Sequence, residues 1–385
     1  MALPNGTETP DSIENFYASK SVFITGGTGF LGKILVEKLL YSCPNIDKIF
    51  LLIREKQKSD ARERIKQLVN LPVFHRLQKE RPEDLKKVVP VLGDLILPNL
   101  GICEEDERLL IDKVFVFVST AYSNTDRAVL EEVVYPPPAS IDEVYKIIEQ
   151  GCSNAVQTSN LLSCRPNTYT FVKALTETLV KEEHGNVPSI IIRPSIVSAS
   201  WNEPVRGWVD HWYGATGLLT TVAKGANRIL LSRKSNILDL IPVDYVTNLT
   251  IVAAARANGS KDVLVYNSCT GAVNALTMGE VSHLIIDYSI NNNFSFIGDC
   301  WLRLFGKLPR FMKMHAKVIQ IRDTLQYFTS HSWVMRCTRA QELFASLSST
   351  DRSRFPFEPT QIVWSTYIPT YFMGIREYLL KEKTR

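Results

Sequence analysis

The chain has 385 residues, of which 45% are hydrophobic and 22% are charged. This composition is typical of a globular protein with a sizeable core, and it excludes a disordered chain and a small disulfide scaffold. The formal net charge is only +4, so the composition predicts no nucleic-acid partner. The seven cysteines are scattered without a CxxC pair, which predicts a reducing compartment and no metal site.

The sequence gives little sign of membrane insertion or targeting. No run of about 18 apolar residues occurs, so we expect no transmembrane helix. Residues 1–18 are polar and lack the basic and apolar regions of a signal peptide. We therefore predict a mobile leader over 1–18, folded structure from Ser19, and an intracellular chain that is soluble or peripheral to a membrane.

Apolar runs typical of buried strands alternate with helical patterns through the first two thirds of the chain. Strands are predicted at 21–25, 48–53, 88–95, 114–120 and 188–197, with a further strand opening the segment 240–255. Helices are predicted at 33–42, 59–77, 104–113 and 168–183, and in the rest of 240–255. This alternation predicts an α/β fold with a doubly wound parallel sheet of the Rossmann type.

The pattern changes in the second half of the chain. Residues 201–217 are dense in Trp and Gly and are predicted to be a loop-rich insert, part of a substrate region near 200–240. Beyond residue 279 the pattern is mostly helical. We therefore expect a Rossmann-like domain over 19–275 and a C-terminal helical domain over 280–385.

A glycine-rich segment, TGGTGFLG, joins the first predicted strand to the first predicted helix. Its residues are Thr25, Gly26, Gly27, Thr28, Gly29, Phe30, Leu31 and Gly32. A pyrophosphate must approach backbone amides closely at such a turn, and a helix N-terminus adds partial positive charge. The position of the turn in the first strand–helix unit favours dinucleotide binding over a purely structural turn.

Residues at the ends of the next two strands bear on which dinucleotide is bound. Arg54 directly follows the second strand, where it favours a 2′-phosphate and hence NADPH, although Glu55 leaves open a plain solvated charge cluster. Asp94, at the end of the third strand, is placed to meet the adenine. A helix cap is the alternative for Asp94.

Tyr169 and Lys173 form a YxxxK pair, which places both side chains on one face of a helix. A carbonyl that accepts hydride needs a proton donor, and a nearby ammonium stabilises a tyrosine phenolate. The hydroxyl of Thr120, or that of Ser119, would hold the carbonyl oxygen. We therefore predict Tyr169, Lys173, Thr120 and Ser119 as catalytic residues, with simple packing of Tyr169 on the sheet as the alternative.

Beyond the glycine turn and the YxxxK pair, several longer segments resemble the alcohol-forming fatty acyl-CoA reductases of the extended short-chain dehydrogenase/reductase superfamily. They are EEVVYPPP (131–138), RPNTYTFVKALTE (165–177), IIRPSIV with WNEPVRGWVD (191–210), IPVDYV (241–246), YFTSHSWV (327–334) and VWSTYIPTYFMGIREYLL (363–380). Together they touch most of the chain. The last two are similar to that family's own helical domain.

The resemblance implies a double reduction. NADPH would reduce a long-chain acyl-CoA to a bound aldehyde, and a second NADPH would reduce the aldehyde to a primary alcohol. Lys173 would also bind the nicotinamide ribose, and Pro194 would join the cofactor-binding residues. The resemblance further implies localisation at the endoplasmic reticulum or peroxisome membrane.

The sequence departs from that family by apparent internal shortening. Only 26 positions separate Asp94 from Thr120, too few for the further strand and helix that the resemblance implies there. The lost strand would lie next to the first strand, and the lost helix is one through which this superfamily often dimerises. We expect the strand 114–120 to move beside the first strand and keep one sheet. A second shortening is expected between Asn293 and Leu304, and we expect the chain to lack the family's hydrophobic C-terminal anchor.

Three further alternatives remain open from the residues. The segment 307–328 alternates basic and apolar residues, as in a peripheral membrane helix or in a core-facing helix with one solvated side. The whole chain could be a catalytically silent NADP-binding protein, because the glycine turn is intact while the sheet beside it is cut. It could also act on a nucleotide sugar, although the aromatic C-terminal segments argue against that substrate.

Overall fold

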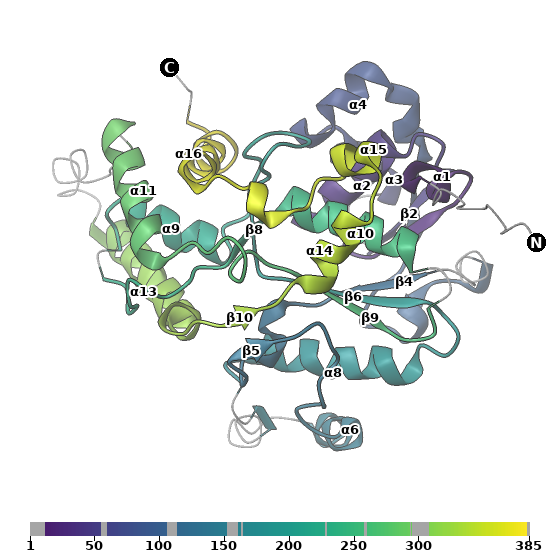
Figure 1. Cartoon of the computed structure of the whole chain (residues 1–385), viewed down its shortest axis with the longest axis horizontal. Helices are drawn as coiled ribbons and strands as arrows, with labels where there is room; N and C mark the ends of the chain where they lie inside the picture. Colours follow the sequence, from purple (N-terminus) through teal and green to yellow (C-terminus); the bar gives the residue numbers. More distant parts are fainter. Residues whose placement is uncertain are drawn as a thin grey trace, which may run out of the picture.

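The computed structural model describes residues 12–54, 60–105, 114–151, 161–162, 165–227, 229–257, 260–292, 294 and 308–382, with the side chains of 308–315 left out. Most of the predicted helix 104–113 lies outside the described residues, as do Glu55 and the second shortening at 293–304. Figure 1 shows strands in the middle of the molecule, flanked by helices, with a helical group from the second half of the chain at one end.

The first three strands form a parallel sheet in the order β1, β2, β3. They are β1 Val22–Ile24, β2 Ile49–Ile53 and β3 Val88–Leu92. The helix predicted at 59–77 is divided into α3 (Ala61–Val69) and α4 (His75–Glu80), because Pro72 opens an intervening 3-10 turn over Pro72–Phe74. The helix α2 (Phe30–Ser42) follows the glycine turn as predicted.

Three later strands form a second parallel sheet, in the order β4, β6, β9. They are β4 Phe115–Val118, β6 Ser189–Pro194 and β9 Leu264–Ser268. The helices α8 (Thr168–Glu183) and α10 (Val243–Arg256) lie on opposite sides of this sheet (Figure 1). The parallel strands and flanking helices confirm the predicted Rossmann-type class.

The expected single sheet is wrong, because β4 does not pair with β1. In the described part of the chain, β1 pairs only with β2 and β4 only with β6. The amide groups of Phe115 and Ser119 donate to the carbonyls of Pro188 and Ile192 on the β6 side. The shortened connection therefore leaves two sheets of three strands.

Two short parallel pairs attach later segments to this frame. The strand predicted at 188–197 is broken at Ser195, after which β7 (Ile196–Ser198) pairs with β8 (Leu240–Pro242). The other pair joins β5 (Val129–Leu130) to β10 (Val334–Met335), which brings the C-terminal region against the segment after Thr120.

The expected mobile leader is wrong for its last residues, since the chain is folded from Ser12. The helix α1 (Ile13–Tyr17) is capped by the Ser12 hydroxyl, and Ile13 is fully buried. The hydroxyl of Tyr17 donates to the carbonyl of Ile251 at 2.8 Å. Residues 1–11 lie outside the described part.

The remaining helices lie mostly in the second half, as predicted. They are α6 Ile141–Glu149, α9 Ala215–Ala223, α11 Met278–Asn291, α13 Leu308–Ser330, α14 Thr338–Ala345, α15 Ser349–Arg354 and α16 Trp364–Gly374, which continues as a π-helical turn over Ile375–Leu379. Short 3-10 turns cover Pro82–Lys87, Pro98–Gly101, Ala121–Asn124 and Pro359–Gln361. None of the described helices combines the length and apolar content that crossing a bilayer requires.

The C-terminal helix α16 packs directly on the loop-rich insert. The Tyr367 hydroxyl donates to the carbonyl of Ala199 at 2.6 Å, and the Tyr371 hydroxyl lies 2.6 Å from that of Thr216. One hydrophobic cluster includes buried residues of both expected domains. From the loop-rich insert, Trp208 and Val209 are buried in this cluster.

Candidate active site

The glycine turn has the backbone geometry that a dinucleotide requires. Gly26 has a φ of +68°, a conformation that favours glycine, and its carbonyl accepts the N–H of Gly29 at 2.9 Å. A Cβ at Gly32 would lie 2.3 Å from that carbonyl, so only glycine lets α2 begin so close to the turn. Nothing lies within 4 Å of a Cβ built at Gly26, so the outer side of the turn is open.

The N-terminus of α2 completes this cradle. Gly29 is the N-cap and offers no side chain to the first amide groups of the helix, so they are not capped from within. Thr25, Thr28 and Gly29 are exposed at the turn. These features fit a pyrophosphate at the helix N-terminus.

The loop-rich insert lies beside this cradle, which the sequence did not predict. The ring of His211 packs edge-on against Phe30, with 4.5 Å between the ring centroids. One turn along α2, Lys33 forms a 2.5 Å ion pair with Asp210. No spacing rule links residues 30–33 to 210–211, so only the fold could reveal this contact.

Arg54 and Asp94 come together at the ends of β2 and β3. Their side chains form an ion pair at 3.6 Å, and the Arg54 side chain is 68% exposed. Asp94 also accepts the N–H of Ile96 at 3.2 Å, so it caps the turn after β3. Both expectations for Asp94 are compatible with this position, because one carboxylate oxygen caps the turn while the other faces Arg54.

Thr120 and Tyr169 meet where β4 ends and α8 begins. Thr120 is buried and caps the following turn by accepting the N–H of Tyr122 at 3.3 Å. Burial raises the pKa of Tyr169, and a hydrogen bond with the Thr120 side chain opposes this effect. The raised pKa keeps the phenol protonated near neutrality, and Tyr169 is 56% exposed, so it is reachable from outside.

Lys173 lies one helical turn from Tyr169 but points elsewhere. Its Nζ donates to the carbonyl of Val118 at 2.8 Å and lies 6.0 Å from the centre of the Tyr169 ring. Desolvation lowers the pKa of Lys173, while the charge of Glu177 raises it. The structure thus brings Lys173 near the predicted site without contact to the phenol oxygen.

Ser119 is not directed at Tyr169. Its hydroxyl donates to Glu177 Oε1 at 2.5 Å, inside the protein. Of the two neighbouring hydroxyls that the sequence offered, Thr120 is therefore the one beside the phenol. Pro194 ends β6 in the same sheet, buried and in register with Ser268 of β9.

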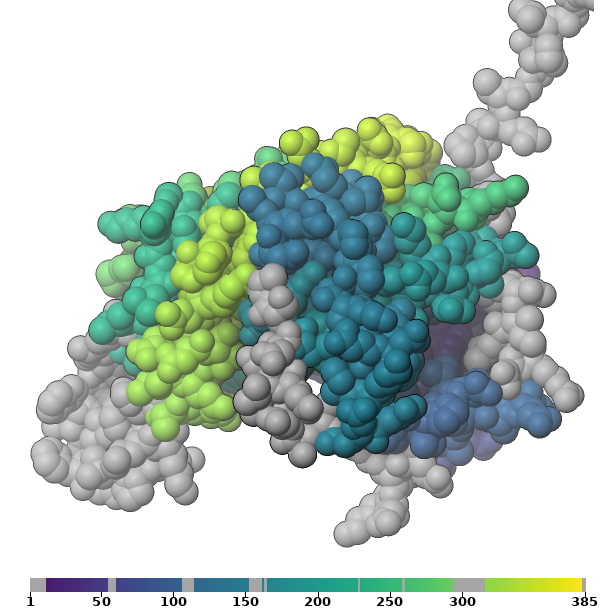
Figure 2. Space-filling view, turned by 90° about the horizontal axis from the view of Figure 1, so that it is seen from below, coloured from purple at the N-terminus to yellow at the C-terminus, as the bar shows by residue number. Residues whose placement is uncertain are grey.

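The surface around α8 is formed by neighbouring segments of the chain. Seen from below, α6 and α8 lie on the outer face, with the C-terminal region beside them (Figure 2). Tyr145 and Ile148 of α6 are 55% and 60% exposed, and Val172 of α8 is 54% exposed. Exposed apolar side chains therefore occur on both helices.

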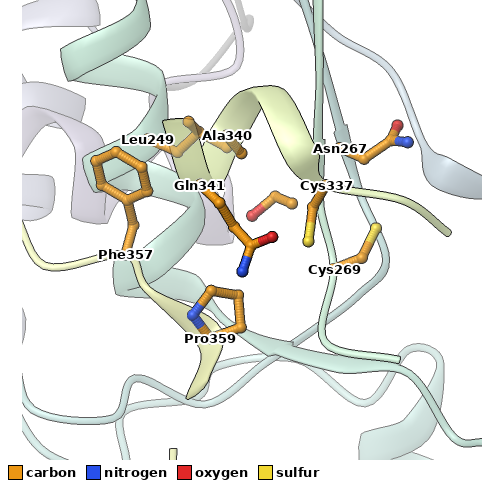
Figure 3. Close-up of a pocket in the computed structure, with 9 residues that line it drawn as sticks. Leu249, Asn267, Cys269, Cys337, Ala340, Gln341, Phe357 and Pro359 are labelled. Atoms are coloured by element: carbon orange, nitrogen blue, oxygen red, sulfur yellow. The ribbon is translucent and has the colours of Figure 1, made fainter. Parts of the chain in front are cut away.

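A small cavity lies elsewhere, between α10, β9 and α14 (Figure 3). Its lining residues are Leu249, Asn267, Ser268, Cys269, Cys337, Ala340, Gln341, Phe357 and Pro359. None of the predicted site residues is among them. Burial raises the pKa of Cys337 to about 12, so this thiol is unreactive near neutrality.

The glycine turn and the parallel sheets with their flanking helices define a protein of the Rossmann type. Relatives place the chain more narrowly. It is 34% identical to a fatty acyl-CoA reductase 1 from Xenopus laevis and 32% identical to the human protein of that name, over 97% of this chain and 87% of each relative. The chain belongs to the fatty acyl-CoA reductase family and is an oxidoreductase.

Family models and solved structures agree with this assignment. Two models described as "Male sterility protein" match this chain, a NAD-binding one at 24–114 and 111–250 and a second one at 293–382. The terminal reductase domain of the myxalamid biosynthetic pathway has a similar fold, with a TM-score of 0.62, 18% identity and coverage of 96% of this chain and 93% of that domain. A reductase domain from Mycobacterium tuberculosis also has a TM-score of 0.62, at 15% identity, over 96% of this chain and 92% of that one.

The comparisons also bear on the predicted shortening. The Xenopus laevis alignment runs over 447 positions but uses 97% of this chain, about 373 residues, so about 74 positions of the alignment have no counterpart here. The match to the NAD-binding model is interrupted at 111–114, directly before β4. That is the place where the sequence predicts a missing strand and helix.

Proposed function

We propose that this chain reduces a long-chain fatty acyl-CoA to a primary alcohol through a bound aldehyde, with NADPH as the reductant. The observations that carry the proposal are the Thr120 side chain next to the Tyr169 phenol, after the end of β4, and a glycine turn of dinucleotide-binding geometry. The similarity to fatty acyl-CoA reductases supports the substrate class. The family resemblance supports a long acyl chain and a location at the endoplasmic reticulum or peroxisome.

Residues of the first sheet would hold the cofactor. The amide groups of Phe30 and Leu31 would bind the pyrophosphate, and the exposed guanidinium of Arg54 would bind the 2′-phosphate. Asp94 would orient Arg54 and face the adenine. When bound, the cofactor supplies a hydride to the substrate carbonyl.

Residues of α8 and of the segment after β4 would stabilise the negative charge that develops on that carbonyl oxygen. The Thr120 hydroxyl would hold the oxygen, and Tyr169, whose raised pKa keeps its phenol protonated, would donate a proton to it. In the first reduction the carbon–sulfur bond then breaks and releases the CoA thiol. In the second reduction, Thr120 and Tyr169 would act on the aldehyde in the same way. Lys173 would have to leave the carbonyl of Val118 to stabilise the Tyr169 phenolate.

The test is product analysis by mass spectrometry after incubation with NADPH and a saturated long-chain acyl-CoA. We expect fatty alcohol, at least a hundredfold less from Tyr169→Phe, and an unchanged yield from the control Tyr145→Phe, whose side chain is exposed on α6. A parallel incubation with a nucleotide sugar in place of the acyl-CoA tests the other substrate class, and a modified nucleotide sugar would support that alternative. An unchanged yield from Tyr169→Phe would contradict the assigned proton donor.

A second candidate is a silent NADP-binding protein of the same family. Two observations favour it: Lys173 contacts Val118 and not the phenol, and β1 and β4 belong to separate sheets. NADPH binding by a folded protein that forms neither aldehyde nor alcohol would support this candidate. A contact of α13 with a membrane surface also stays a proposal, although Val318 on its described part is buried.

A further inference from the structure

We propose that Glu177, fixed by Arg193, is a positioning residue of the reductase site. It would hold Ser119 so that Thr120 faces Tyr169, and its carboxylate would act on the ammonium group of Lys173 one helical turn away. The inference rests on the proposed function for its effect on turnover. Its effect on Lys173 can be measured without turnover.

Glu177 and Arg193 form a buried, two-pronged ion pair. Nε and Nη2 of Arg193 donate to the two carboxylate oxygens of Glu177 at 2.9 and 2.6 Å. The Glu177 and Arg193 side chains are only 1% and 2% exposed. Such a bidentate pair holds both side chains in a single orientation.

Arg193 is itself held by the backbone after β5. Its Nη1 donates to the carbonyl of Glu131 at 3.0 Å and its Nη2 to that of Val133 at 2.8 Å. The guanidinium therefore connects β6 to α8 and to the segment EEVVYPPP (131–138). Glu177 cannot turn away from the end of β4 without breaking several of these bonds.

The Glu177 carboxylate accepts hydrogen bonds from two hydroxyl groups next to the site. Glu177 Oε1 accepts from Ser119 Oγ at 2.5 Å and from Ser123 Oγ at 3.2 Å. Ser119 directly precedes Thr120, and Ser123 lies within the turn that Thr120 caps. Because Ser119 is fixed at one side, the backbone of Thr120 is fixed as well, and its hydroxyl is left for Tyr169.

The same carboxylate acts on Lys173 through space. Residues 173 and 177 lie four apart on α8 and share a helix face. Desolvation lowers the pKa of Lys173, and the charge of Glu177 opposes that effect. A neutral amine could not stabilise a phenolate at Tyr169.

The experiment compares Glu177→Gln and Glu177→Asp with Glu182→Gln, which removes an exposed carboxylate of the same helix. The lysines are ¹³C-dimethylated, and the Lys173 signal, assigned with Lys173→Arg, is titrated by NMR. We expect a lower Lys173 pKa in Glu177→Gln and an unchanged pKa in Glu177→Asp and Glu182→Gln. Both Glu177 variants should lose about 10- to 100-fold in kcat with little change in KM. The shorter Asp no longer reaches Ser119, and the neutral Gln no longer raises the pKa of Lys173.

Breaking a buried ion pair can unfold a protein, so a double variant removes both charges. Glu177→Gln with Arg193→Met leaves no unpaired buried ion, and we expect it to fold with the same loss in kcat and the same lower Lys173 pKa. An unchanged Lys173 titration in either folded variant that carries Glu177→Gln overturns the proposal, as does full activity. If the wild type proves inactive, the proposed function fails while the titration still decides the role of Glu177.

Discussion

Nζ of Lys173 donates to the carbonyl oxygen of Val118 at 2.8 Å, on the side of β4 that faces away from β6. Consecutive residues of a parallel strand direct their backbone groups to opposite edges. Phe115 and Ser119 donate to β6, so the carbonyl of Val118 points to the other edge. No described strand pairs with that edge, and Lys173 supplies the hydrogen bond that a neighbouring strand would otherwise give.

This relationship predicts the effect of Lys173→Met. If Lys173 leaves Val118 to bind the nicotinamide ribose, its loss should raise the dissociation constant of NADPH about 10- to 100-fold, since a hydrogen bond from a charged group contributes about 1.5 to 3 kcal/mol. Fluorescence titration measures this constant. Lys181→Met, on the exposed end of the same helix, should change it less than twofold. Equal affinities for wild type and Lys173→Met would show that Lys173 stays on Val118.

Cofactor choice is predicted to depend on Arg54. In Arg54→Glu a carboxylate replaces the exposed guanidinium beside Asp94, and it would repel a 2′-phosphate. We expect NADPH affinity to fall at least tenfold and NADH affinity to fall much less, so that the preference between them narrows or reverses. Arg62→Glu, exposed on α3, controls for the change in net charge. A proportional loss for both cofactors would contradict a phosphate-binding role for Arg54.

The glycine turn, most strands and the YxxxK helix could be predicted from sequence because each depends on residues that are close in the chain. Gly26 and Gly32, for example, are required by the backbone of a single turn. The pairing of β4 could not be predicted, because a shortened connection is compatible with one sheet or with two. The choice depends on contacts between strands whose edges look alike in the sequence.

The residues that surround the site could not be predicted from local sequence patterns either. Glu177 follows Lys173 at helical spacing, a signal that could have placed it on the same face, but its pairing with Arg193 depends on how α8 packs on β6. The contacts of Asp210 and His211 with α2 cross about 180 residues of chain. Ser119 and Thr120 were equivalent in the sequence, and only the direction of each side chain separates them.

The packing of α16 on the insert predicts a strong effect of one methyl group. A Cβ at Gly374 would lie 1.7 Å from the carbonyl oxygen of Gly207, a contact that forces the helix and the loop apart. We expect Gly374→Ala to lower the free energy of unfolding by about 3 kcal/mol or more, measured by urea denaturation. Gly279→Ala in α11, where the nearest atom would be 3.3 Å away, should change it by less than about 1 kcal/mol. Similar stabilities for the two variants would mean that α16 is not held against Gly207 in solution.

The insert is also anchored by a buried carboxylate whose titration should be visible in stability. Asp244 accepts the N–H groups of Trp201 and Asn202 at 2.9 Å each, and that of Glu203 at 3.3 Å. Desolvation raises the pKa of Asp244 from its ordinary value of 3.8 to about 6, although the three N–H groups favour the anion. The folded state therefore binds the proton more tightly than the unfolded state.

The sign of the pH dependence follows from this difference. Between about pH 4 and pH 6 the folded protein carries more protons at Asp244 than the unfolded chain, so its stability falls as the pH rises through that window. The contribution reaches about 3 kcal/mol, since each tenfold change in proton affinity corresponds to about 1.4 kcal/mol. Asp244→Asn has no such titration and leaves at least one of the three N–H groups facing an amide NH₂. The free energy of unfolding of the wild type relative to Asp244→Asn should therefore be greatest near pH 4 and level off above pH 6. If this difference in free energy instead grows with pH, the three N–H bonds outweigh the cost of burying the carboxylate.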